Sequence, residues 1–245
     1  MLPLFYTACS RGLLAIFASL AFACSAGPEP APAPVAPVAP PMTNPSISYL
    51  ALGDSYTIGE GAAPADRWPV QLAVLARTQG LPLAEPDIIA RTGWTTAELQ
   101  AAIAASGNRR TDYGLVSLLI GVNNQYRGQS VALYRTEFRQ LLATAVGYAG
   151  GQAGHVVVLS IPDWGQTPFA QGRDQAQIAR EIDQFNAAAQ QECQAAGIAF
   201  VPITDFTRGA AGEASQFTTD GLHYTGSQMR QWATRALPIV QGLLK

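Results

Sequence analysis

Short apolar runs alternate with segments of helical periodicity from residue 46 to the end of the chain. Apolar runs of this length, bounded by glycine and polar residues, predict buried strands. The predicted strands cover residues 48–52, 88–90, 115–120, 156–160 and 198–201. Strands that are apolar on both faces and alternate with helices are typical of an α/β fold, here with a parallel sheet of about five strands covered by helices on both sides.

Apolar residues spaced three or four positions apart predict the helices between these strands. Cys193 falls on the apolar face of one such helix, so we expect a buried hydrophobic residue there rather than a catalytic thiol. Thr225 and Gln228 fit a capping box at the start of the last helix. The clearest helical stretches cover residues 68–75, 131–145, 178–193 and 229–236. Ligands of such folds bind beyond the carboxyl ends of the strands, so the chemistry is expected at that edge of the sheet.

The first 26 residues have the pattern of an export signal. Arg11 is their only charged residue, and the mostly apolar run that follows it is too short to span a bilayer comfortably. Ala21-Phe22-Ala23, a small-x-small pattern, precedes Cys24. Residues 1–26 therefore resemble a bacterial lipoprotein signal that is cut before Cys24, the residue that would carry the lipid. An ordinary secretory signal cut after Ala23 or Ala26 is the alternative.

Residues 27–45 hold repeated Ala-Pro and Val-Ala-Pro units, which predict an extended, semi-rigid spacer. A spacer directly after a lipidated cysteine suits a membrane-tethered domain. Residues 46–245 are enough for one domain with a sizeable core. We therefore predict an exported bacterial domain, periplasmic or at the cell surface, that is held at the membrane through Cys24.

The charge pattern excludes one class of partner and gives no sign of a metal site. Charged residues make up 13% of the chain, the formal net charge is −2, and no basic run or stripe is present. Nucleic acid is therefore not expected as a partner. The chain has only two histidines, far apart in the sequence, and no cluster of cysteines and histidines. Neither a metal site nor a cofactor is predicted.

The first predicted strand runs into the segment Gly53-Asp54-Ser55-Tyr56. Glycine permits a tight turn that can hold the Ser55 hydroxyl exposed, as a nucleophile requires. Asp54 is interpreted as a scaffold residue that braces the turn through backbone contacts. Taken alone, the segment also fits an ordinary turn, since Gly, Asp and Ser favour turns generally.

A serine nucleophile needs a base, usually a histidine. His155 directly precedes the fourth predicted strand and so lies at the wrong edge of a parallel sheet. His223 lies just before the last predicted helix, and Asp220, three residues earlier, can turn back to orient its imidazole. Ser55, His223 and Asp220 are therefore the predicted catalytic residues. Taken alone, Asp220 fits an ordinary turn residue about as well, and His223 fits a surface-loop residue about as well.

Acyl transfer also needs hydrogen-bond donors aimed at the developing oxyanion. Gly93 follows the second predicted strand and can present its backbone N–H. Asn123 follows the third and offers a side-chain amide. With the N–H of Ser55, these groups form the predicted oxyanion hole. A glycine lead-in to a helix and an Asn-rich turn are the alternative interpretations of Gly93 and Asn123.

These segments, in this order, resemble the GDSL or SGNH hydrolase family, whose blocks supply Ser, Gly, Asn and His. The matching residues are Ser55, Gly93, Asn123 and His223, and Asp220 matches the Asp of the family's terminal D-x-x-H element. Tyr56 stands where the name-giving motif often has leucine. The resemblance covers residues 46–245 and implies a three-layer α/β/α sandwich with a flavodoxin-like parallel sheet, the SGNH hydrolase fold. It also implies a serine esterase that hydrolyses carboxylic esters.

Aromatic residues follow several predicted strands and are expected to line a substrate cleft. They are Trp94, Tyr126, Trp164 and Phe169, with Arg127 beside them. An aromatic rim suits a sugar ring or an acyl chain. The resemblance and the predicted location favour a lipid ester such as a lysophospholipid, or an O-acetylated glycan.

Two hypotheses without catalysis compete with the esterase. One is a non-catalytic surface-binding lipoprotein on the same fold, and the other is a structural lipoprotein that anchors the cell wall. The combined Ser, Gly, Asn, Asp and His set argues against both, because neither role needs a base beside a nucleophile.

Overall fold

Five parallel strands form the centre of the fold. The structure is a computed structural model, and it describes residues 46–245. The strands are β1 (Tyr49–Gly53), β2 (Asp87–Ala90), β3 (Leu115–Leu119), β4 (Val156–Leu159) and β5 (Ala199–Val201). Each agrees to within one residue at both ends with a strand predicted from the sequence, so those predictions are confirmed. The predicted export signal 1–26 with Cys24, and the linker 27–45, lie outside the described residues.

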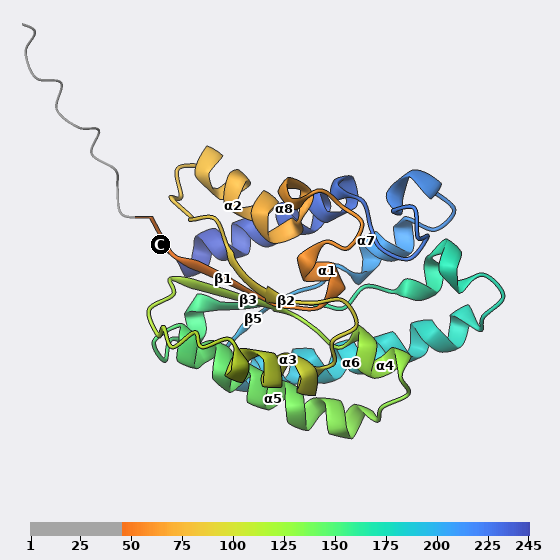
Figure 1. The fold of residues 1–245 in the computed structure, drawn as a ribbon, viewed down its shortest axis with the longest axis horizontal. Helices are drawn as coiled ribbons and strands as arrows, with labels where there is room; N and C mark the ends of the chain where they lie inside the picture. The colour runs from red at the N-terminus through yellow and green to blue at the C-terminus, as the bar shows by residue number, and fades with distance from the viewer. Residues whose placement is uncertain (1–45) are drawn as a thin grey trace, which may run out of the picture. The chain divides into compact units, whose positions relative to one another are not determined.

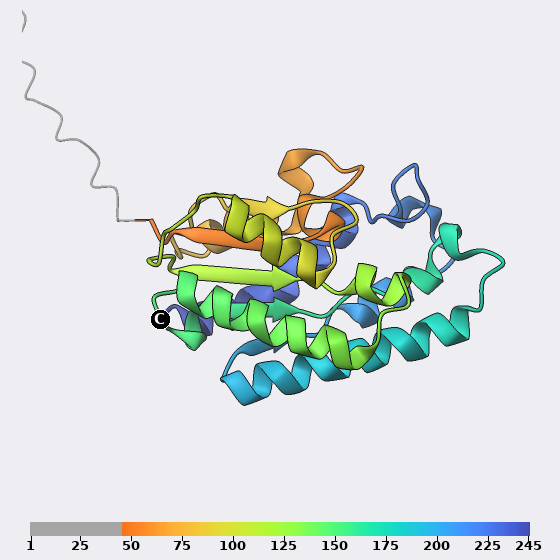
Figure 2. The same cartoon turned by 60° about the horizontal axis from the view of Figure 1, so that its bottom comes forward.

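The strand order is β2-β1-β3-β4-β5, and every neighbouring pair is parallel. Figure 2 shows the strand arrows pointing the same way. The chain passes from β1 outward to β2 and then returns to β3 on the other side of β1. The winding direction therefore reverses between β1 and β3, and in flavodoxin-like sheets of this order ligands bind at that point, beyond the carboxyl ends of the strands.

Helices cover both faces of the sheet. They are α1 (Ser55–Ile58), α2 (Trp68–Thr78), α3 (Thr96–Ala105), α4 (Val122–Tyr126), α5 (Val131–Tyr148), α6 (Gln175–Ala196), α7 (Thr204–Gly209) and α8 (Gly226–Leu243). Figure 1 shows α2 and α8 on one face of the sheet and α3, α5 and α6 on the other. Within the layers, α2 packs on α8, and α5 packs on both α3 and α6. The fold is the predicted three-layer α/β/α sandwich.

The burial of each strand follows its place in the sheet. All residues of β1, β3 and β4 are buried, whereas the edge strands β2 and β5 are mostly part-exposed. Burying one Leu or Val side chain contributes about 1.5 to 3 kcal/mol. The central strands are therefore firmly placed, and they fix the positions of the loops at their carboxyl ends.

The start of α8 differs from the prediction. The Thr225 hydroxyl accepts no capping hydrogen bond from the helix, and Gln228 Nε2 donates to the Phe206 carbonyl oxygen at 2.8 Å. The predicted capping box is therefore wrong, because the Gln228 side chain binds Phe206 and not the start of its own helix. A capping box occurs instead at the start of α3. There Thr95 N donates to Glu98 Oε2 at 2.8 Å, and the Thr95 hydroxyl accepts from Glu98 N.

Cys193 lies on α6 and is buried, as predicted. Burial raises the pKa of its thiol to about 12, so little thiolate is present at neutral pH. Within residues 46–245, no helix is both long enough and apolar enough to cross a membrane.

Candidate active site

Ser55 is the first residue of α1 and lies directly beyond β1. The turn is tight, because a Cβ atom on Gly53 would lie 2.2 Å from Thr57 Oγ1 and 2.4 Å from the Leu119 carbonyl oxygen. Only glycine fits there. The Ser55 backbone N–H opens the helix and has no hydrogen-bond partner in the described part of the chain. Ser55 is 4% exposed and lines a cavity.

Asp54 braces this turn. Its Oδ1 accepts a hydrogen bond from Tyr56 N at 3.0 Å and so caps α1. The side chain is fully buried, and Oδ2 has no hydrogen-bond partner among the described residues. Burial raises the pKa of the carboxyl to about 7, against the opposing effect of the Tyr56 N–H. These contacts agree with the scaffold role predicted for Asp54.

Asp220 holds His223 in the loop before α8. The imidazole Nδ1 lies 2.6 Å from Asp220 Oδ2. Asp220 Oδ1 accepts hydrogen bonds from His223 N at 2.9 Å and from Leu222 N and Thr218 Oγ1 at 2.8 Å. Burial acts to raise the pKa of Asp220, but the hydrogen bonds outweigh it and hold that pKa well below its ordinary value. The ionised carboxylate fixes the ring and leaves Nε2 for another partner.

Tyr56 packs against the histidine ring. The ring centroids of Tyr56 and His223 are 5.7 Å apart in an edge-to-face arrangement. Tyr56 also packs on Tyr224 and Trp232, at centroid distances of 5.8 Å and 6.2 Å. The aromatic residue that replaces leucine in the motif is therefore part of the wall that holds His223.

Gly93 and Asn123 bring hydrogen-bond donors to the same cavity. Gly93 has a φ of +85°, which favours glycine, and its carbonyl oxygen accepts from Arg127 Nη2 at 2.6 Å. The Gly93 N–H has no partner among the described residues. Asn123 Nδ2 donates to the Trp94 carbonyl oxygen at 2.9 Å. This bond orients the amide and leaves its second hydrogen free.

One cavity gathers these residues from four separate segments of the chain. Its volume is about 170 Å³. Pockets that enclose drug-sized ligands measure roughly 300 to 1,000 Å³. Its wall includes Ser55, Thr92, Gly93, Asn123 and His223. No hydrogen bond joins Ser55 to the His223 ring in the described structure, and such bonds often tighten only when substrate binds.

Three of the predicted cleft residues line this cavity, namely Tyr126, Trp164 and Phe169. Trp94 does not. Its side chain packs, partly buried, against the hydrophobic core, while its backbone carbonyl meets Asn123. The expectation that Trp94 lines the cleft is therefore wrong.

Arg127 also stays outside the cavity wall. Its Nη1 pairs with Glu98 Oε1 at 3.1 Å, and its Nη2 binds the Gly93 carbonyl. Arg127 therefore supports the loop that carries Gly93 instead of lining the cleft.

Several wall residues were missed from the sequence. They are Tyr56, Thr92, Val122 and Leu222. Each is next to a predicted site residue in the chain, and that adjacency is the signal that would have found them.

His155 lies where the sequence predicts. It ends a 3₁₀ helix, Ala153–His155, directly before β4, at the amino edge of the sheet. It does not line the cavity, so His223 is the only histidine there. Nowhere in residues 46–245 are three His, Cys, Asp or Glu side chains grouped so as to hold a metal ion.

A flavodoxin-like sheet with Ser, Gly, Asn and an Asp-oriented His at its carboxyl edge is the arrangement of the SGNH class of hydrolases. The model of the GDSL-like Lipase/Acylhydrolase family matches residues 51–230, and the chain belongs to this family. No curated protein matches the sequence.

Several solved structures share the fold. TesA is 20% identical, with a TM-score of 0.62 over 80% of this chain and 99% of TesA. The psychrotrophic esterase EstA from Pseudoalteromonas sp. is 15% identical, with a TM-score of 0.62 over 81% of this chain and 99% of EstA. Axe2, an acetylxylan esterase from Geobacillus stearothermophilus, is 16% identical, with a TM-score of 0.59 over 79% of this chain and 93% of Axe2. At these identities the similarity establishes the fold.

Proposed function

We propose that this protein is a serine esterase that hydrolyses short-chain carboxylic esters. The supporting observation is the single cavity that Ser55, Gly93, Asn123 and His223 line together. In the proposed reaction Ser55 Oγ attacks the ester carbonyl carbon while His223 Nε2 takes its proton. Asp220 stabilises the resulting imidazolium, which then protonates the departing alcohol. Water, activated by the same imidazole, hydrolyses the acyl-enzyme.

The proposed oxyanion hole has three donors. The N–H groups of Ser55 and Gly93 have no partner among the described residues, and the Asn123 amide keeps one hydrogen free. Fixed donors of this kind stabilise the charge that develops on the carbonyl oxygen. The Gly93 carbonyl and the Asn123 amide each make a hydrogen bond within the protein. These bonds support the proposed orientation of the two donors, because they hold the Gly93 peptide and the Asn123 side chain in place before the substrate binds.

The size of the cavity favours a short acyl group. A volume of about 170 Å³ suits an acetyl or butyryl group better than a long fatty-acyl chain. Of the two predicted substrate classes, an O-acetylated glycan is therefore favoured over a lysophospholipid. The structural similarity to Axe2, which is described as an acetylxylan esterase, is consistent with this preference.

The test is hydrolysis of 4-nitrophenyl acetate and butyrate by the Ser55→Ala variant. We expect Ser55→Ala to abolish turnover and labelling by a fluorophosphonate probe, with the thermal midpoint nearly unchanged. Ser227→Ala is the matched control, because it removes an exposed hydroxyl at the start of α8 and should leave activity intact. Retained turnover in Ser55→Ala would exclude Ser55 as the nucleophile. Failure of the folded wild-type protein to react with the probe would favour the non-catalytic binding protein.

We further propose that the domain works outside the cytoplasm, tethered through a lipid on Cys24. The support is the leader pattern in residues 1–26 and the Pro-rich segment 27–45. Mass spectrometry of the mature N-terminus should find an acylated Cys24. An unmodified terminus after Ala23 or Ala26 would instead indicate ordinary secretion.

A further inference from the structure

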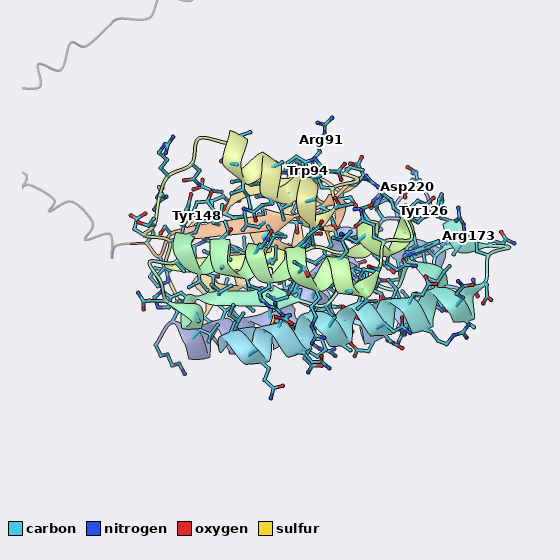
Figure 3. The ribbon with its side chains drawn as sticks, turned by 90° about the horizontal axis from the view of Figure 1, so that it is seen from below. Arg91, Trp94, Tyr126, Tyr148, Arg173 and Asp220 are labelled. Carbon is cyan, nitrogen blue, oxygen red and sulfur yellow. The ribbon has the colours of Figure 1, made fainter. Side chains whose placement is uncertain are left out.

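Arg173 lies over three aromatic residues of the cavity wall. Its guanidinium carbon is 5.0 Å from the ring centroid of Phe169, 5.3 Å from that of Trp164 and 5.6 Å from that of Tyr126. All three rings line the candidate active site. In the view of Figure 3, Tyr126, Arg173 and Asp220 lie at the same end of the molecule and Tyr148 at the other. A cation therefore lies over three aromatic residues of a largely apolar cavity wall.

The aromatic cluster under Arg173 is well defined. Trp164 and Tyr126 meet edge to face at 5.2 Å between centroids, and Phe169 lies 6.2 Å from Trp164. Trp164 Nε1 donates to Gln125 Oε1 at 2.7 Å, which fixes the indole. The outer rings are accessible, since Tyr126 is 48% exposed and Phe169 is 39% exposed. A substrate at the cavity mouth would therefore meet these rings and the cation above them.

The backbone holds Arg173 close to the proposed catalytic loop. Arg173 N donates to the Ala170 carbonyl oxygen at 3.0 Å. Phe169 N donates to the carbonyl oxygen of Gly221, two residues before His223, at 2.9 Å. The segment that carries Arg173 is thus tied to the loop that positions His223.

The guanidinium of Arg173 has no hydrogen-bond acceptor in the described part of the chain. Among residues 46–245, Arg173 makes no ion pair and no side-chain hydrogen bond, although its head group carries five N–H donors. The Asp220 carboxylate is already engaged by the His223 ring and by three other donors. Aromatic faces attract the positive charge but leave these donors without strong acceptors. A carboxylate or phosphate would supply both the charge and the acceptors.

We propose that Arg173 forms an anion-binding subsite at the mouth of the active site, so that the enzyme prefers short-chain esters that carry a carboxylate, phosphate or sulfonate group. This inference rests on the proposed esterase function. The aromatic cluster places the cation, and Arg173 contacts the anion while Ser55 attacks the ester. The anion can belong to the alcohol or to the acyl group, and matched substrates distinguish the two sources.

The test compares kcat/KM for two pairs of esters. In the first pair, 2-naphthyl acetate and its 6-sulfonate differ by a charge on the alcohol. In the second, 2-naphthyl butyrate and 2-naphthyl hemisuccinate differ by a charge on the acyl group. The proteins are wild type, Arg173→Met, Arg173→Lys and the control Arg230→Met, which removes an exposed arginine of α8 that has no ion pair among the described residues.

For wild type we expect the charged ester to be preferred in at least one pair. Arg173→Met should lower that preference about fivefold at low ionic strength, the upper range for an exposed ion pair, and change the neutral ester less than twofold. Arg173→Lys should retain part of the preference, Arg230→Met should retain all of it, and added salt should weaken it. If Arg173→Met slows neutral and charged esters equally, Arg173 only braces the rings and the proposal is wrong. An equal loss of preference in Arg230→Met would point to general charge effects and overturn it as well.

Binding to the Ser55→Ala protein separates this proposal from the esterase function. Titration with 2-naphthyl acetate and its 6-sulfonate, and with the second pair, measures anion preference without turnover. Tighter binding of a charged ester that is lost in Ser55→Ala/Arg173→Met supports the subsite even if wild type hydrolyses none of the four esters. Equal affinity for charged and neutral esters in both pairs would refute the subsite even if wild type is an active esterase.

Discussion

Replacing Asp54 by asparagine should stabilise the folded protein above neutral pH and have a smaller effect in acid. Asp54 is fully buried, and among the described residues only its Oδ1 has a hydrogen-bond partner, Tyr56 N. Asparagine keeps an acceptor for that N–H and resembles the protonated carboxyl in shape. The substitution therefore removes the titration while leaving the cap of α1 in place.

The magnitude follows from the pKa of Asp54. Burial raises this pKa from 3.8 to about 7 in the folded state. Between these values the folded protein keeps a proton that the unfolded chain has released, so raising the pH favours unfolding. The stability that the proton provides is fully present below about pH 4 and is lost as the pH rises through about 7. At about 1.4 kcal/mol per pKa unit, the whole loss is roughly 4 kcal/mol.

The assay is urea unfolding of both proteins between about pH 5 and pH 8.5. Other titrating groups are common to both, so the difference between their unfolding free energies isolates Asp54. We expect the advantage of Asp54→Asn to grow by roughly 2 to 3 kcal/mol over this range. Glu213→Gln, which removes an exposed carboxylate, is the control and should track wild type at every pH. A difference between Asp54→Asn and wild type that does not change with pH would refute the burial argument.

Two further substitutions test the proposed catalytic groups, with kcat and KM measured for 4-nitrophenyl acetate. Asp220→Asn should lower kcat by at least about a hundredfold with little change in KM, because the bond that orients the His223 ring is weakened. An unchanged kcat would mean that the backbone alone orients the ring. Asn123→Ala should also lower kcat about a hundredfold through loss of an oxyanion donor. If only KM rises, Asn123 binds substrate and is not such a donor.

The strands of the sheet can be predicted from the sequence because a buried strand position restricts which residue types can occupy it. Strands β1, β3 and β4 are covered on both faces, so all their positions must be small or apolar, and the runs end where the chain leaves the core. The strand order is not visible in such runs. It is implied only by the family resemblance, which predicts the flavodoxin-like sheet that the structure contains.

The candidate site is predictable to the extent that its contacts are local. Asp220 and His223 are three residues apart, and their hydrogen bond forms within one loop. In a parallel sheet the strands end at one edge, which brings Ser55, Gly93 and Asn123 to one cavity.

The positions of side chains that make tertiary contacts cannot be predicted from local sequence patterns. Gln228 matches a local capping pattern, yet it binds Phe206 on α7. Trp94 follows the right strand, yet its ring turns to the core. Arg173 shows no motif at all, and its place over the aromatic cluster depends on the path of a loop that no local pattern encodes.

Two carboxyl groups belong to the proposed catalytic turn and loop, and their surroundings shift their pKa values in opposite directions. Burial raises the pKa of Asp54 to about 7, so below that pH its neutral form predominates beside the Ser55 N–H that is proposed to bind the oxyanion. A negative charge at that place would oppose the charge that develops in the reaction. Hydrogen bonds hold the pKa of Asp220 low, so its charge persists beside the ring that must become positive. Because environment and not residue type sets these shifts, the aspartate adjacent to Ser55 is suited to a scaffold role, and Asp220 is suited to assist the proposed base.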